Sequence, residues 1–166
     1  MTMAKVAAEA GQNQALIGYH FGGKQGLVAA VARRVTERIT SEALAAVAGA
    51  ERIEAMAGDA LDAVWHLMEM DEGLQRVYFD LAAQSTLDPD IQVLMAEVKA
   101  GYREILAGRI GLLAPALTAA ELEAAAVFVM AGIEGLALQR LDRGDTSSLL
   151  AARQIWVRSV GAALDD

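Results

Sequence analysis

Apolar residues recur every three or four positions along most of the chain, which is the spacing of one face of an α-helix. Two short stretches of this kind come first, at residues 4–10 and 14–20. Longer stretches follow at residues 24–47, 52–70, 74–86, 89–113, 119–143 and 149–164. No alternation of apolar and polar residues is long enough to indicate a sheet. The pattern therefore predicts an all-α protein.

Turn and cap residues separate these stretches at the expected places. Asn13 is a good N-cap for the second short helix, and Pro89 can open a helix because its missing N–H costs nothing there. Thr118 and Glu121 have the spacing of a capping box, in which each side chain bonds the other residue's backbone N–H. Further breaks are expected at Gly11, Gly22–Gly23, Gly49, Asp71–Gly73 and Gly144–Thr146.

The two short helices, joined by a glycine turn, match a helix-turn-helix, whose second helix enters the DNA major groove. Leu16 and Ile17 are expected to point inward from the second helix. Gln14 and Tyr19 could then exchange hydrogen bonds with DNA, and Lys24 could neutralise a phosphate. On spacing alone, the stretch also fits two amphipathic helices of an ordinary helical protein.

Charge is distributed unevenly along the chain. The net charge is −8, yet residues 1–40 contain five basic and two acidic side chains and carry +3, which leaves −11 for the remainder. Phosphate contacts supply most of the non-specific affinity for DNA, so a basic head on an acidic body suits a DNA-binding protein. A chance fluctuation in so small a count is the alternative.

The N-terminal run resembles the DNA-binding signature of the tetracycline-repressor (TetR) family of transcriptional regulators. Its strongest part is Tyr-His-Phe-x-x-Lys, from Tyr19 to Lys24. The matching residues are Ala7, Ala10, Gly11, Asn13, Ile17, Tyr19, His20, Phe21, Lys24 and Leu27. The resemblance implies that Asn13, Gln14 and Ala15 lie at the groove, that Tyr19, His20 and Lys24 bind backbone phosphates, and that Phe21 packs inward.

The resemblance also implies a domain organisation and a function. Residues 1–45 would form the helix-turn-helix region with its connecting helix, and residues 46–166 a helical ligand-binding and dimerisation domain. The expected protein is a ligand-responsive repressor. It would bind a palindromic double-stranded DNA operator as a homodimer through its last two helices, and a small, largely apolar effector would release it.

Two departures from the family keep an alternative open. Gln12 stands where the family has an apolar residue, and the family has a further helix before Ala4, so an incomplete head is expected. The alternative is a helical ligand-binding and dimerisation module that has no DNA-binding activity.

An effector pocket would lie between helices of the body, because helical bodies can enclose apolar cavities with a few polar groups. Glu134 is a carboxylate within an otherwise apolar helix, where it could meet a cationic or hydroxyl-bearing ligand or lie on a solvated edge. An aromatic or methionine side chain at helical spacing is more often simply core. The candidates are Trp65, Met68, Tyr78, Phe79, Gln84, Met95, Tyr102, Phe128, Met130, Glu134 and Trp156.

Other functional classes find little support. His66 and Glu69 could face a metal ion together, but the chain has only two histidines and no cysteine, so neither a metal site nor a catalytic residue is expected. No cofactor motif occurs. The chain has no uninterrupted apolar run of membrane-spanning length and no signal-peptide pattern. The absence of cysteine fits a reducing compartment, and a cytoplasmic location without membrane contact is expected.

Overall fold

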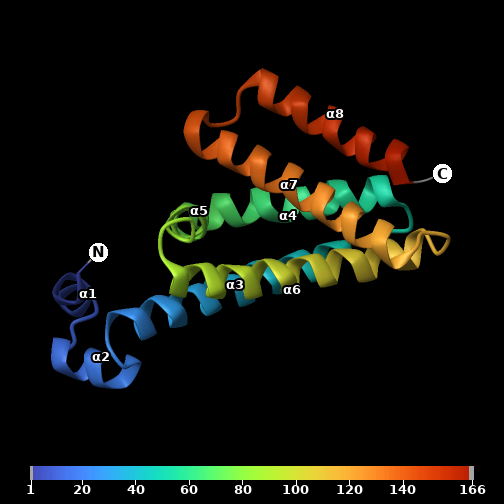
Figure 1. The fold of residues 1–166 in the computed structure, drawn as a ribbon. Coiled ribbons are helices and arrows are strands. Elements are labelled where there is room, and N and C mark those ends of the chain that lie inside the picture. Colours follow the sequence, from blue (N-terminus) through green and yellow to red (C-terminus); the bar gives the residue numbers. More distant parts are fainter. Residues whose placement is uncertain (1, 165–166) are drawn as a thin grey trace.

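A computed structural model describes residues 2–164 and contains only helices within that range, which confirms the all-α prediction. The helices form an elongated molecule with a small head at one end, made of α1, α2 and the start of α3 (Figure 1). The remainder of α3 and the helices α4 to α8 form the body. The helices are α1 (Met3–Glu9), α2 (Gln14–Phe21), α3 (Lys24–Val47), α4 (Ile53–Met70), α5 (Glu72–Gln84), α6 (Pro89–Leu113), α7 (Ala119–Arg143) and α8 (Ser147–Leu164).

The helix boundaries follow the local cap chemistry closely. The side chain of Asn13 accepts a hydrogen bond from Ala15 N at 2.8 Å, and the predicted capping box of Thr118 and Glu121 is present. Pro89 opens α6 behind the capping side chain of Asp88. These bonds satisfy backbone N–H groups that have no partner within the helix. The predicted starts of α2, α6 and α7 are therefore confirmed.

Two helices start two residues before the predicted position. The break expected at Asp71–Gly73 is confined to Asp71, because its side chain accepts from Leu74 N at 3.3 Å and caps α5 from Glu72 onward. Likewise α8 begins at Ser147, since Thr146 Oγ1 accepts from Leu149 N at 3.2 Å. In both places, a capping side chain begins the helix earlier than its apolar periodicity indicates.

Helix α4 is the centre of the body and packs against α3, α5, α7 and α8. Its predicted apolar face is buried, and Met56, Ala57 and Leu61 have no exposed surface. Trp65 and Leu67 are buried as well, so α4 is apolar around most of its circumference, as a helix enclosed on several sides must be. Around it, α3 and α6 lie side by side below, while α7 and α8 lie above (Figure 1).

The head has its own small apolar cluster, to which α1 contributes Ala7, α2 contributes Ile17 and α3 contributes Leu27. The expectation that Leu16 also points inward was wrong, because 56% of its surface is exposed. Neighbouring residues of a helix point about 100° apart. In α2 the inward direction is that of Ile17, so its neighbour Leu16 faces solvent.

Candidate DNA-binding surface and ligand cavity

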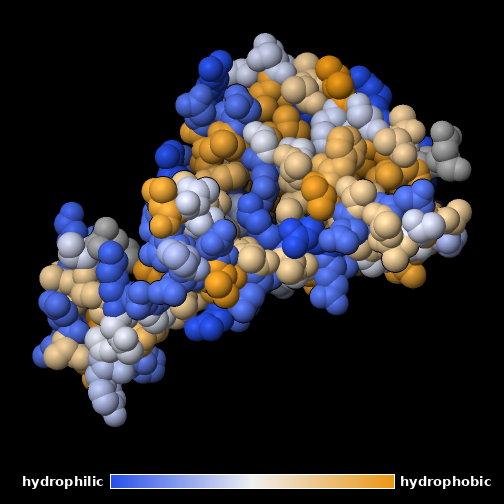
Figure 2. Space-filling model, viewed as in Figure 1, coloured by the Kyte–Doolittle hydropathy of each residue, from blue (hydrophilic) through white to orange (hydrophobic). Residues whose placement is uncertain are grey.

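The exposed side of α2 carries the residues that were predicted to contact DNA. Gln14, Ala15, Tyr19 and His20 are all exposed, with Tyr19 at 88% of its surface, and Lys24 follows at the start of α3. The surface of this head is largely hydrophilic (Figure 2). The arrangement places hydrogen-bonding groups and one cation on a single protruding end of the molecule.

Asn13 and His20 each contact a residue of α2. The Oδ1 atom of Asn13 caps α2, which leaves the amide nitrogen of Asn13 for another partner. The ring of His20 meets the ring of Phe21 edge-on, with 4.7 Å between centroids. Phe21 is half-buried against the head cluster. Gly22 then adopts a left-handed backbone (φ 69°) that ends α2 and turns the chain towards Lys24.

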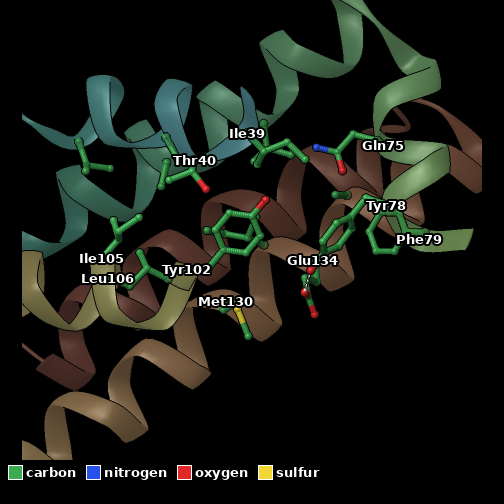
Figure 3. Close-up of a pocket in the computed structure, with 16 residues that line it drawn as sticks. Ile39, Thr40, Gln75, Tyr78, Phe79, Tyr102, Ile105, Leu106, Met130 and Glu134 are labelled. Atoms are coloured by element: carbon green, nitrogen blue, oxygen red, sulfur yellow. Dashed lines mark hydrogen bonds between the residues drawn. The ribbon is translucent and has the colours of Figure 1, made fainter. Parts of the chain in front are cut away.

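A cavity of about 90 Å³ lies in the body, and every helix from α3 to α7 contributes to its wall. Figure 3 shows Tyr102 reaching into it from α6, with Thr40 of α3 on one side and Gln75 and Tyr78 of α5 on another. Nearly all of its surface is apolar. The lining residues are Ile39, Thr40, Ala43, Val47, Ala60, Val64, Gln75, Tyr78, Phe79, Tyr102, Ile105, Leu106, Met130, Ile133, Glu134 and Ala137.

Glu134 already has two partners at the edge of this cavity. The hydroxyl of Tyr78 donates a hydrogen bond to its carboxylate (Figure 3). Lys99 Nζ lies 3.6 Å from the same oxygen, Oε1. The charge of Glu134 is therefore balanced within the protein, which makes it a weak attractant for a cationic ligand.

Two polar groups of the cavity lack a partner. The hydroxyl oxygen of Tyr102 is buried and makes no hydrogen bond. The hydroxyls of Thr36 and Thr40 are close enough to favour its ionised form, but neither has hydrogen-bond geometry to it. Gln75, with 3% of its surface exposed, is the only buried polar residue among residues 2–164, and its amide has no partner there. The buried hydroxyl of Tyr102 is costly to leave unpaired.

Five of the eleven candidate ligand-binding residues line this cavity: Tyr78, Phe79, Tyr102, Met130 and Glu134. They come from three helices and meet because α5, α6 and α7 pack against one another. Whether these five residues contact a ligand stays a prediction. The cavity gives that prediction a defined site.

The other six candidates lie outside the cavity and have different surroundings. Trp65 Nε1 donates to Asp145 Oδ1 at 3.0 Å, and the guanidinium groups of Arg140 and Arg153 lie over its ring. Phe128 has 44% of its surface exposed. Gln84, on the exposed end of α5, donates to Asp80. The remaining three, Met68, Met95 and Trp156, pack in other apolar clusters.

Gln75 and Thr40 also line the cavity, although the sequence did not identify them as candidates. Gln75 precedes Tyr78 and Phe79 by three and four positions, so it shares their helix face. A glutamine on an apolar face was the signal that could have identified it. Thr40 follows Ile39 on α3, and no comparable signal distinguishes it.

The buried tyrosines predict a loss of stability at alkaline pH. Burial raises the pKa of Tyr102 to about 12, and burial followed by the bond to Glu134 raises the pKa of Tyr78 further. Both groups thus keep their proton in the folded protein over a range where the unfolded chain loses it. Below about pH 10 both tyrosines are protonated in the folded and the unfolded protein, and the free energy of unfolding does not depend on them. As the pH rises from 10 towards 12, the free energy of unfolding falls by up to about 1.4 kcal/mol per pH unit for each tyrosine.

Tyr102→Phe is expected to reduce this alkaline loss, measured by urea unfolding at several pH values between 9 and 11.5. At neutral pH the same variant should be at least as stable as the wild type, because it removes a buried hydroxyl that has no hydrogen-bond partner. Equal pH slopes for the wild type and the variant would contradict the assignment.

His66 and Glu69 are exposed, and no group of three or more His, Cys, Asp or Glu side chains within residues 2–164 could hold a metal ion. Over the same range, no helix combines the length and apolarity that crossing a bilayer demands.

Comparisons with known proteins agree with this architecture. A model of bacterial regulatory proteins of the tetR family matches residues 1–31, and one of the C-terminal region of BetI-type transcriptional repressors matches residues 48–165. No curated protein matches the chain.

Two solved structures share the fold. A TetR transcription regulator from Haloarcula marismortui ATCC 43049 has a TM-score of 0.76 at 20% identity, and the alignment covers 99% of this chain and 87% of that one. For a transcriptional regulator from Rhodococcus sp. Rha1, the TM-score is 0.78 at 18% identity, with the same coverage.

Proposed function

Because the chain belongs to the TetR family of transcriptional regulators, we propose that it is a repressor that binds a palindromic double-stranded DNA operator as a homodimer. A small, largely apolar effector enters the cavity and releases the protein from DNA. One observation carries this proposal: α3 is a single helix that begins at Lys24 in the head and lines the cavity with Ile39, Thr40, Ala43 and Val47.

The continuous helix offers a physical route between the two sites. A ligand that pushes on Ile39 or Thr40 changes the tilt of α3, and the head moves with the other end of that helix. The effector acts in this way only if it binds the released pose more tightly than the DNA-bound pose. The predicted boundary between residues 45 and 46 falls in the last turn of α3, which fits a head and a connecting helix that move together.

The outer faces of α7 and α8 support a dimer. Phe128, Leu138 and Ile155 are exposed apolar residues there, and the exposed Ala131 and Gly135 let a second helix approach closely. Apolar side chains gather over this part of the body (Figure 2). A face of this kind is typical of a protein interface. A twofold axis through it would present two heads to half-sites about 34–36 Å apart, or a multiple of that distance.

Lys24→Ala and Tyr19→Ala are each expected to weaken operator binding without changing the oligomeric state. Fluorescence anisotropy of labelled DNA from upstream of the gene, titrated at several salt concentrations, measures the effect. Loss of one cationic phosphate contact per chain in Lys24→Ala should flatten the slope of log affinity against log salt by about 2 in a dimer, whereas Tyr19→Ala removes no charge and should lower the affinity with the slope unchanged.

Arg143→Ala is the matched control, because it removes an exposed basic side chain from the body, at the C-terminal end of α7. It should leave both affinity and slope unchanged. If the two head variants bind DNA as tightly as the wild type, α2 is not the DNA-binding helix.

A further inference from the structure

We propose that the cavity takes a small uncharged molecule whose polar group both accepts and donates hydrogen bonds, as an amide or lactam does, and that Gln75 binds this group. The inference rests on the proposed function in treating this cavity as the effector site. It goes further in naming the chemical class of the effector and the residue that selects it.

The apolar wall defines most of the ligand. Ile39, Val64, Leu106 and Ile133 surround the space together with aromatic rings, so the bulk of an occupant must be apolar as well. An apolar cavity of 150 Å³ accepts a benzene ring. The space of about 90 Å³ here is smaller, so a short chain fits as it stands and a six-membered ring fits only when the lining side chains move outward.

Gln75 defines the polar group. Its amide enters the cavity from α5 (Figure 3) and has no hydrogen-bond partner among residues 2–164. A side-chain amide offers an acceptor and a donor side by side in one plane. The group that satisfies both at once presents a donor beside an acceptor, which a lactam or carboxamide does and a ketone or ether does not.

Tyr102 and Thr40 add to the same preference. The unpartnered hydroxyl of Tyr102 is a donor that a carbonyl oxygen in the cavity can satisfy. The hydroxyl of Thr40 enters from α3 beside it (Figure 3). A ligand carbonyl held by Tyr102 and Gln75 would therefore connect α5 and α6 next to the helix that carries the head.

Charged ligands fit this cavity poorly. A cation would need a free carboxylate, but Glu134 is paired with Tyr78 and Lys99. An anion would need a free cation, and the lining contains no lysine, arginine or histidine. Burying an unpaired charge costs far more than burying a neutral amide that is hydrogen-bonded.

Three ring compounds of similar size test the class: 2-piperidone, which is a lactam; cyclohexanone, which only accepts; and piperidine, which is a cation at pH 7. The readout is the ¹³C-methyl resonance of Met130, which lines the cavity, and it is assigned with a Met130→Leu variant. The methyl of Met70, on the exposed end of α4, reports non-specific effects.

The expected result is that 2-piperidone shifts the Met130 resonance with an affinity about 3- to 10-fold higher than that of cyclohexanone, the difference that one net hydrogen bond makes. Piperidine should leave Met130 unshifted. In Gln75→Leu the two neutral rings should bind equally. Gln84→Leu, a matched change on the outer end of the same helix, should keep the preference for the lactam.

Several results would overturn the inference: equal binding of both neutral rings to the wild type, a preference for piperidine, a Met130 resonance that no ring shifts, or a lactam preference that survives Gln75→Leu. If Gln75→Leu does not fold, the binding of the three compounds to the wild type still tests the chemical class of the ligand. DNA anisotropy on the same samples separates the two proposals. Normal DNA binding without lactam selectivity overturns only this inference, whereas lactam selectivity without DNA binding supports it and contradicts the regulator function.

Discussion

Gly132→Ala should destabilise the protein by about 1–3 kcal/mol, although alanine is the better helix former. Gly132 lies in the interior of α7, and a Cβ atom there would overlap the indole ring of Trp156 on α8. That ring is packed against the main core and cannot move aside without disturbing α8. The cost is overpacking, and urea unfolding at neutral pH measures it.

Gly101→Ala is the control that separates overpacking from helix propensity. Gly101 lies in the interior of α6 and is exposed, and a Cβ atom there would meet nothing within 4 Å. The same substitution should therefore stabilise the protein by about 0.5–1 kcal/mol. Opposite signs for the two variants are the expected result.

A double-mutant cycle tests the cause directly. In a Trp156→Phe background the smaller ring leaves room for the new methyl group, so Gly132→Ala should cost less than it does in the wild type. Equal costs in both backgrounds would assign the destabilisation to something other than the contact with Trp156.

Phe128→Glu should convert the proposed dimer into a monomer and reduce affinity for the proposed operator by about 10²- to 10⁴-fold. In a dimer related by a twofold axis, the same face meets itself, so the substitution introduces one carboxylate from each chain into an apolar interface. Loss of the dimer also removes the gain in affinity that comes from linking two DNA-binding heads. Light scattering after size exclusion gives the mass, and DNA anisotropy gives the affinity.

Leu112→Glu provides the comparison. Leu112 is more exposed than Phe128, at 73% of its surface, but lies on α6, away from the outer face of α7 and α8. This variant should keep the dimer mass and the DNA affinity. A dimer that persists in Phe128→Glu would place the interface on another surface.

The sequence was most informative where structure is decided by neighbours along the chain. The starts of α2, α6 and α7 depend on Asn13, Pro89 and the pair Thr118–Glu121, whose hydrogen bonds reach only two or three residues. Periodicity identified the buried face of α4 for the same reason, because helix geometry alone places residues three and four apart on one side. Membership of the TetR family was evident from residues 19–24.

The cavity shows the opposite situation. Tyr78 and Trp65 are both large aromatic residues at helical spacing, yet Tyr78 lines the cavity whereas Trp65 bonds Asp145, 80 residues away along the chain. No local pattern distinguishes them. The unpartnered amide of Gln75 likewise becomes apparent only when the helices around it are assembled.

By itself, then, the sequence determined the helical architecture, most helix ends and the family, since periodicity, caps and a contiguous motif are local properties of the chain. Only the tertiary structure decided which side chains enclose the cavity, which of Leu16 and Ile17 is buried, and which charges are already paired. These outcomes depend on how helices distant in the chain pack against one another, because burial and pairing are properties of the assembled surfaces and not of any single helix.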